Sequence, residues 1–383
     1  MHLYNIDCIV GARPNFIKIA PIMRALSGRN GISPRLIHTG QHYDVAMNAV
    51  FFEELAIPSP DVNLEVGSGT HTEQTARIMS ALEPVFVARC PHLVLVVGDV
   101  NSTMAASLVA SKLNIPIAHV EAGLRSFDRT MPEEINRIVT DRLSDLLFAS
   151  EPSAVDNLVN EGVAIGQIHL VGNVMIDSLY ACLDRAVPPH ATLAKMGAST
   201  QFLEAATEQG FGLVTLHRPS NVDDPVKLEA LLRALNSISH DLCLIFPVHP
   251  RTRAVISAAG LNDLLGSATF VTPPLSYLQV LGLMRGARLA ITDSGGVQEE
   301  TTALGVPCLT VRENTERPIT VQEGTNTIVG SSPDDLIAAA THILRSGARK
   351  GRIPALWDGK AASRIAHHIE AFLRAKKAPQ LGS

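Results

Sequence analysis

Residues 93–103 read LVLVVGDVNST, and this stretch decides the class of fold. The run LVLVV is apolar without interruption and rich in β-branched side chains, which is typical of a strand buried on both faces of a parallel sheet. Asp99 follows one residue later, and residues 102–113 are helix-forming. A buried strand that ends in polar residues and leads into a helix is the repeating unit of an α/β fold.

The same alternation of short apolar runs and helix-forming segments extends along the chain in both directions. Further strand candidates lie at residues 6–10, 36–40, 117–123, 146–150, 168–173, 211–217, 243–249, 268–272, 289–295 and 307–311. We therefore expect one α/β domain at 1–176, a second at 177–362, and a C-terminal helix and tail at 363–383. Two such domains predict a cleft between them, where ligands usually bind.

Composition and charge exclude several classes of protein. Of the 383 residues, 46% are hydrophobic and 18% are charged, which excludes wholesale disorder. The 32 basic and 37 acidic residues give a formal net charge of −5, so no broad nucleic-acid-binding surface is expected. No apolar run approaches the roughly 18–20 residues that span a membrane, and no secretory leader is recognisable. We expect a cytoplasmic protein that binds neither nucleic acid nor membrane.

The cysteines and histidines give no metal-binding pattern. The five cysteines are far apart and form no C-x-x-C pair, so neither a disulfide framework nor a zinc cluster is expected. His217 and His249 each end a predicted strand with an arginine close behind, but neither has a second ligand four residues on. A lone histidine is more often structural than catalytic, whereas two at strand ends favour a functional role.

Carboxylates gather at strand ends in the first half of the chain. Asp99 and Glu121 each end a predicted strand, at the edge where open α/β sheets bind ligands. Asp99 could instead cap the following helix. Glu133 and Glu134 lie in the first turn of a predicted helix, where acidic residues also complement the helix dipole. Asp99, Glu121 and Glu133 together resemble an acid/base cluster.

Cations accompany these carboxylates. The loop GARPNFIK at 11–18 places Arg13 and Lys18 beside a helix start, an arrangement that suits a phosphate or another anion. A simple turn with two solvated cations would look the same in sequence. Arg125 follows Glu121 closely along the chain, and Arg137 follows Glu133 and Glu134. Neither a G-x-G-x-x-G nor a Walker A motif occurs here, which argues against a dinucleotide-binding domain and against a P-loop domain.

The strongest local signal in the second half is TDSGGVQEE at 292–300. A strand delivers Ser294, Gly295 and Gly296 to the start of a helix, where glycines let backbone N–H groups approach an anion. Glu300 is placed to accept two sugar hydroxyls, and Arg317 follows in the TERP segment at 315–318. A turn alone would explain the glycines but not the whole set.

In order, the motifs GARPNFIK, GDVNST, HVEAGLRS, MPEEINR, TLHRPSN, HPRTR, TDSGGVQEE and TERP resemble those of the non-hydrolysing UDP-N-acetylglucosamine 2-epimerases, over residues 11–318. The resemblance implies two Rossmann-like domains facing a central cleft, the GT-B fold, with UDP bound by the second. It implies a homodimeric isomerase that interconverts UDP-GlcNAc and UDP-ManNAc and supplies ManNAc-type precursors for surface polysaccharide. In the family, UDP is eliminated to leave a 2-acetamidoglucal and then re-added on the other face, without nicotinamide, metal or another cofactor.

Residue roles follow from the matching motifs. The resemblance assigns catalysis to Asp99, Glu121, Glu133 and His217. The nucleotide and phosphate contacts that it implies are Arg13, Lys18, Ser294, Gly295, Gly296, Glu300 and Arg317. Three further residues, which lie beside these motifs, complete the expected substrate-binding set: Arg125, Arg137 and His249.

The sequence is also compatible with other functions. The linker RSFDRTMP at 125–132 is closer to that of relatives acting on 2,3-diacetamido uronic acid sugars, whereas TERP favours the GlcNAc enzymes. A GT-B glycosyltransferase would leave the carboxylates without a purpose, and a non-catalytic UDP-sugar sensor would not need them. Some relatives bind a second UDP-GlcNAc as an activator near a GQH loop. Because this loop continues with Asp44 and the later segment reads VGSGTHTEQ, we expect no such control.

Overall fold

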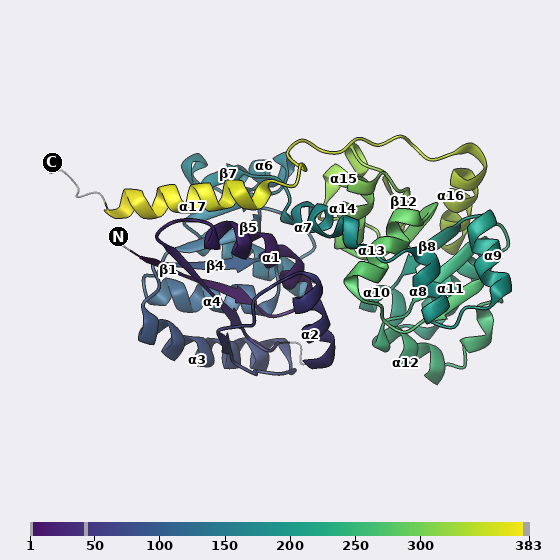
Figure 1. Cartoon of the computed structure of the whole chain (residues 1–383), viewed down its shortest axis with the longest axis horizontal. Helices are drawn as coiled ribbons and strands as arrows, with labels where there is room; N and C mark the ends of the chain where they lie inside the picture. The colour runs from purple at the N-terminus through teal and green to yellow at the C-terminus, as the bar shows by residue number, and fades with distance from the viewer. Residues whose placement is uncertain (1–2, 42–44, 378–383) are drawn as a thin grey trace. The chain divides into compact units, whose positions relative to one another are not determined.

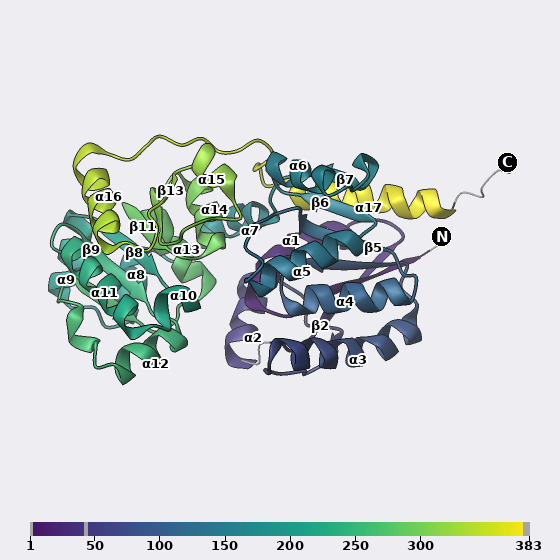
Figure 2. The same ribbon diagram turned by 180° about the vertical axis from the view of Figure 1, so that it is seen from behind.

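The computed structural model describes residues 3–41 and 45–377; the side chains of Arg13, residues 45–49 and Lys377 lie outside the description. The chain divides into two compact units, Met1–Ala181 with Ala355–Ser383, and Cys182–Pro354. The first boundary thus lies five residues beyond the predicted one at 176. Each unit is a parallel sheet with helices on both faces (Figures 1 and 2), which confirms the predicted α/β class.

The described part of the N-terminal unit holds a seven-stranded sheet in the order β3-β2-β1-β4-β5-β6-β7. Its strands are β1 (Tyr4–Val10), β2 (Ile32–His38), β3 (Val62–Asn63), β4 (Leu93–Val97), β5 (Ile117–Ala122), β6 (Leu146–Ala149) and β7 (Ile168–Leu170). Its helices are α1 (Arg13–Ser27), α2 (Val45–Glu54), α3 (His71–Arg89), α4 (Asn101–Lys112), α5 (Pro132–Leu143), α6 (Pro152–Asn160), α7 (Val174–Cys182) and α17 (Ala361–Lys377). The strand order reverses between β1 and β4, which creates the switch point where such sheets bind ligands.

Burial explains the apolar runs of this sheet. All five residues of β4 are buried, and the strand pairs in parallel with β1 on one side and β5 on the other. Because helices cover both faces, alternating polarity would place polar groups in a core. The continuous apolar run at 93–97 is therefore the pattern that a central strand requires.

The described part of the C-terminal unit holds a six-stranded sheet in the order β10-β9-β8-β11-β12-β13. Its strands are β8 (Phe211–Thr215), β9 (Cys243–Pro247), β10 (Thr269–Thr272), β11 (Leu289–Thr292), β12 (Cys308–Thr310) and β13 (Asn326–Ile328). Its helices are α8 (Pro189–Lys195), α9 (Thr200–Glu208), α10 (Pro219–Val222), α11 (Pro225–Ser239), α12 (Pro250–Ala258), α13 (Tyr277–Gly286), α14 (Gly295–Leu304), α15 (Pro318–Gln322) and α16 (Pro333–Ser346). Here the switch point lies between β8 and β11.

The C-terminal helix returns to the first unit instead of forming a separate segment. The carboxylate of Asp177 in α7 caps α17, because it accepts hydrogen bonds from the backbone N–H groups of Ala361 (3.1 Å) and Ala362 (2.7 Å). Arg29, just after α1, pairs with Glu370 of α17 at 3.0 Å. The predicted limit at 362 is therefore replaced by one at 354, where the second unit ends.

Across residues 3–41 and 45–377, no helix combines the length and apolarity needed to cross a membrane.

Candidate active site

A first group of candidate site residues lies in the N-terminal unit, at the carboxyl edge of β1, β4 and β5. Glu121 near the end of β5 forms a buried ion pair with Lys18 of α1. Its φ of +74° is rare for a residue with a side chain, and the β5–β6 register shifts at this point. Such a bulge re-aims a side chain, and strain of this kind concentrates at functional sites. The strand thus turns the Glu121 carboxylate toward Lys18.

Gly98, between β4 and Asp99, packs directly against that ion pair. A Cβ atom added to Gly98 would lie 2.9 Å from Nζ of Lys18 and 3.3 Å from Oε2 of Glu121. Its φ of +66° also favours glycine. Position 98 is therefore kept without a side chain by both backbone conformation and contact.

Asp99 is paired with Arg137 of α5, which connects two predicted site residues. The Oδ2 atom of Asp99 lies 3.1 Å from Nε and 2.8 Å from Nη2 of Arg137. Arg137 also donates to the buried carboxylate of Glu134 at 2.5 Å. Asp99 keeps 23% of its side chain exposed, whereas Arg137 keeps 3%. Arg137 therefore orients Asp99. Its buried guanidinium is bonded to Asp99 and Glu134 and is not presented to a ligand.

The two neighbouring glutamates of α5 have different environments. Glu134 is buried and accepts hydrogen bonds from the backbone amides of Ser126 and Phe127, both at 3.0 Å. It fixes the loop between β5 and α5. Glu133, the predicted catalytic member, is half-buried in the first turn of the helix.

Arg125, another predicted substrate contact, is buried between two carboxylates. Its side chain is 1% exposed and pairs with Asp141 at 2.8 Å and Glu161 at 2.7 Å. These contacts tie the loop after β5 to helices α5 and α6. The predicted substrate contact of Arg125 is corrected to a structural role, because a buried guanidinium held by two carboxylates does not face a ligand.

At the start of α1, where an anion site was predicted, backbone amides are bonded to a side chain of the same helix. The side-chain oxygen of Asn15 accepts hydrogen bonds from the backbone N–H groups of Gly11 and Ala12, both at 3.1 Å. These two amides are thus already bonded. The Arg13 side chain lies outside the described residues, as does Asp44 in the GQHYD motif.

A second group of candidate site residues lies in the C-terminal unit, at the carboxyl ends of β8 and β11. Asp293, directly after β11, is fully buried and lies 2.9 Å from Nδ1 of His217. It also accepts hydrogen bonds from the backbone N–H groups of His217 (3.0 Å) and Arg218 (2.9 Å). Burial opposes ionisation of Asp293, but its bonds with His217 and Arg218 outweigh burial and lower its pKa. The ionised carboxylate therefore orients the half-exposed ring of His217.

Asp293 was missed in the sequence analysis, although its signal was present. It follows a buried apolar strand directly, as Asp99 nearly does. The ring of His249 lies 6.1 Å from that of His217, centroid to centroid, so the structure brings the two predicted histidines together. His249 also caps α12 by accepting a hydrogen bond from the backbone N–H of Arg251 at 3.3 Å.

The glycine-rich turn of TDSGG starts α14 as predicted. Ser294 occupies the N-cap position, and its hydroxyl makes no capping bond to the helix. A Cβ added to Gly295 would lie 2.6 Å from the Arg317 guanidinium, so the helix backbone rests on that cation. Gly296 follows in the first turn. The amide end of α14 and the Ser294 hydroxyl suit a phosphate.

A charge cluster underlies this turn. Glu316 lies 2.6 Å from Arg317, 2.8 Å from Arg312 and 3.4 Å from Arg218, and Arg317 also lies 2.8 Å from Glu299. Burial would raise the pKa of Glu316, but the three arginines hold it far below its usual range. The cluster holds three arginines and two glutamates, and the ionised Asp293 lies beside Arg218, so its charges balance. Although the protein has a net charge of −5, this turn therefore carries no excess of negative charge.

Glu300, on the same helix α14, is buried. Its carboxylate accepts a hydrogen bond from the hydroxyl of Tyr277 at 2.8 Å. Burial raises its pKa to about 7, with Glu299 adding to the rise and Tyr277 opposing it. One of the two oxygens predicted to receive sugar hydroxyls is therefore already used by Tyr277.

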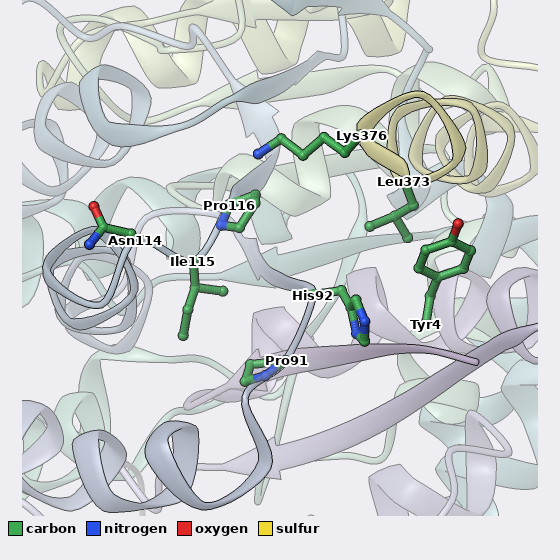
Figure 3. Close-up of a pocket in the computed structure, with 8 residues that line it drawn as sticks. All are labelled: Tyr4, Pro91, His92, Asn114, Ile115, Pro116, Leu373 and Lys376. Atoms are coloured by element: carbon green, nitrogen blue, oxygen red, sulfur yellow. The ribbon is translucent and has the colours of Figure 1, made fainter. Parts of the chain in front are cut away.

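A pocket of about 350 Å³ elsewhere in the N-terminal unit contains none of the predicted residues (Figure 3). It is lined by Tyr4, Pro91, His92, Asn114, Ile115, Pro116, Leu373 and Lys376. These residues lie at the amino ends of β1, β4 and β5 and at the end of α17, opposite the edge that carries Asp99 and Glu121. Among the described side chains, no group of three or more His, Cys, Asp or Glu could hold a metal ion.

Each sheet carries polar residues at its switch point, as ligand-binding α/β proteins do, and the C-terminal unit adds a glycine-rich helix start that suits a phosphate. The family model of UDP-N-acetylglucosamine 2-epimerase matches residues 24–370. The chain belongs to this family, and the predicted resemblance is confirmed.

Two relatives and one solved structure illustrate the similarity. The UDP-2,3-diacetamido-2,3-dideoxy-D-glucuronate 2-epimerase of Pseudomonas aeruginosa is 42% identical over 94% of this chain and 98% of its own. The UDP-N-acetylglucosamine 2-epimerase of Methanocaldococcus jannaschii is 43% identical over 94% and 97%. A structure of an M. jannaschii UDP-GlcNAc 2-epimerase in complex with UDP-GlcNAc and UDP has a TM-score of 0.82 and 40% identity, covering 96% of this chain and 99% of that one.

Proposed function

We propose that this protein is a non-hydrolysing UDP-GlcNAc 2-epimerase that interconverts UDP-GlcNAc and UDP-ManNAc. The observation that carries the proposal is the pair of carboxylates, Asp99 and Glu121, that end the neighbouring parallel strands β4 and β5. Each carboxylate is paired with a cation that holds it in place. Carboxylates so positioned suit the removal and return of a proton on a sugar carbon.

The reaction proceeds by elimination and re-addition. A carboxylate removes the proton from C2 of the sugar, and the C2–H electron pair forms the C1=C2 double bond. The C1–oxygen bond breaks, and its electron pair leaves on UDP. Re-addition of UDP to C1 and of a proton to the other face of C2 gives the epimer. Delivery of a proton to either face of C2 needs more than one acid or base. We assign this role to Asp99, Glu121, Glu133 and His217.

The C-terminal unit binds UDP in this proposal. The amide end of α14, with Ser294 and Gly295, and the arginines around Arg317 support binding of the diphosphate. Lys18 in the N-terminal unit adds positive charge near the carboxylates. Glu300 is assigned to the ribose through the oxygen that Tyr277 leaves free.

A second substrate is favoured by a specific relative. The P. aeruginosa enzyme, 42% identical to this chain, is named for a UDP-2,3-diacetamido uronic acid sugar. Family membership also supports a homodimer, a cytoplasmic location, and a role in supplying ManNAc-type precursors for surface polysaccharide, which complete the proposal.

The test is proton NMR of purified protein incubated with UDP-GlcNAc in D₂O, in parallel with the 2,3-diacetamido uronic acid analogue. The proposal expects UDP-ManNAc that carries deuterium at C2, without any added acceptor. Conversion of the uronic acid sugar alone would select the second substrate. Free ManNAc with UDP would instead identify a hydrolysing enzyme, and product without deuterium would overturn the elimination mechanism. Binding without conversion would identify a sensor.

A further inference from the structure

His119, two residues before Glu121 on β5, has both ring nitrogens directed at acceptors. Nδ1 lies 2.6 Å from Oδ1 of Asp141, and Nε2 lies 2.9 Å from the carbonyl oxygen of Gly98. A carbonyl oxygen only accepts, so Nε2 must carry a hydrogen. The ring is fully buried, so no water can replace either partner.

Asp141 on α5 is the counter-charge of this ring. Burial opposes its ionisation, but His119 and Arg125 outweigh burial and lower its pKa. An ionised carboxylate only accepts, so Nδ1 of His119 carries a hydrogen as well. With a hydrogen on both nitrogens, His119 is an imidazolium held between a carboxylate and a backbone carbonyl.

These contacts join the two strand ends of the candidate site. Nε2 of His119 holds the carbonyl of Gly98, the residue before Asp99. The second oxygen of Asp141 accepts a hydrogen bond from the backbone N–H of Gly123 at 3.1 Å, two residues after Glu121. The pair therefore spans from the end of β4 to the end of β5.

The charges around the pair come from several elements. Asp141 on α5 faces the ring directly, and Arg125, in the loop after β5, faces Asp141 at 2.8 Å. Beyond Gly98 lies the Lys18–Glu121 ion pair, since a Cβ on this glycine would approach both side chains. Against an ionised Asp141, a neutral imidazole would lose one of its two hydrogen bonds and leave either Oδ1 of Asp141 or the Gly98 carbonyl without the donor that His119 supplies.

We propose that His119 is a positioning residue: held as an imidazolium by Asp141, it fixes the strand ends that carry the candidate carboxylates. Its effect on turnover rests on the proposed function. It would act through geometry and a fixed buried charge and does not touch the substrate. Small displacements of reacting groups lower rates strongly, so loss of this link should lower kcat more than substrate affinity.

The kinetic test compares His119→Gln with His169→Gln as a matched control. His169 is a half-buried histidine on the edge strand β7, which β6 separates from β5, and it stacks on His368 with ring centroids 4.1 Å apart. We expect kcat of His119→Gln to fall about 10- to 100-fold with KM nearly unchanged, and His169→Gln to keep both constants. A folded His119→Gln variant with wild-type kcat would overturn the proposal.

A spectroscopic test reads the charge of the ring without depending on activity. Nitrogen-15 NMR of the histidine rings should show hydrogen on both nitrogens of His119 from about pH 6 to pH 8, with the signal assigned by its loss in His119→Gln. Should that variant not fold, Asp141→Asn provides the assignment, because only the His119 ring should lose a hydrogen. A ring with a single hydrogen at about pH 8 in the wild type would overturn the proposal. Absence of epimerisation with an imidazolium present would instead reject the proposed function alone.

Discussion

The imidazole of His217 and the buried carboxylate of Asp293 face each other across 2.9 Å, from Nδ1 to Oδ1. Because Asp293 is ionised, Nδ1 of His217 carries a hydrogen and donates it to this carboxylate. The same carboxylate accepts hydrogen bonds from the backbone N–H groups of His217 and Arg218, so ring and loop are fixed together. Asp293 thus fixes the orientation of the His217 ring.

Replacing Asp293 by Asn should lower kcat about 100-fold or more, the contribution of a well-placed acid or base. The amide can present an N–H to His217 and so favour the wrong tautomer. Asp263→Asn, an exposed carboxylate in the same unit, is the control and should retain wild-type turnover. Steady-state kinetics by NMR measures both. Wild-type kcat in Asp293→Asn would rule out the orienting role.

Gly98→Ala should reduce both stability and turnover. A left-handed alanine costs about 1–2 kcal/mol, and its Cβ would press on Lys18 from 2.9 Å. Gly162→Ala is the control, because Gly162 also has a positive φ of +82° but nothing within 4 Å of its added Cβ. Urea unfolding and kcat should show a similar backbone cost in both variants and loss of turnover in Gly98→Ala alone. Equal turnover of the two would show that contact with the ion pair is unimportant.

Replacing one partner of the Lys18–Glu121 pair should lower the free energy of unfolding more than replacing both. Glu121→Gln leaves a buried ammonium without its counter-charge, a loss of about 3–5 kcal/mol in the free energy of unfolding. The double variant with Lys18→Met should recover much of this loss, since neither charge is then buried. Turnover should be lost in both. A double variant no more stable than Glu121→Gln in urea unfolding would contradict this account.

The raised pKa of Glu300 predicts a pH-dependent penalty on stability. Burial raises its pKa from the ordinary 4.5 to about 7, so the folded protein retains a proton that the unfolded chain releases between these values. Stability should therefore fall as pH rises through this window and then level off, at a cost of about 3 kcal/mol. Glu300→Gln should remove the penalty and gain stability over the wild type at about pH 8 but little at about pH 4.

Urea unfolding at both pH values measures this difference. Glu229→Gln, an exposed glutamate paired with Arg233 on α11, is the control and should show no such trend. A constant difference between Glu300→Gln and the wild type at both pH values would contradict the assigned cause.

Much of the architecture is visible in the sequence because it depends on local pattern. The run at 93–97 predicts a central strand, since burial on both faces requires apolarity at every position. The strands β3 (Val62–Asn63) and β13 (Asn326–Ile328) were not predicted, because polar residues interrupt the sequence there and leave no continuous apolar run. They exist because a neighbouring strand offers hydrogen bonds, which a sequence window does not contain.

Several residues of the candidate site could be predicted from the sequence, but their contacts could not. Asp99 and Glu121 could be named because parallel strands deliver their final residues to one edge. The burial of Arg125 between Asp141 and Glu161 depends on helices 16 and 36 residues away along the chain, and no local pattern encodes it. The same holds for Asp293, whose partners lie 75 and 76 residues away in the sequence.

The docking of α17 onto the N-terminal unit has a consequence for biosynthesis. This helix buries Ala361, Ile365, Ile369 and Leu373, and its first turn is capped by Asp177. The ribosome therefore delivers the last helix of the first unit only after the entire second unit has been made. The second unit, a single uninterrupted stretch from 182 to 354, has all its residues available first. Until then the surface that α17 covers stays exposed, so the half of the protein begun first is the half completed last.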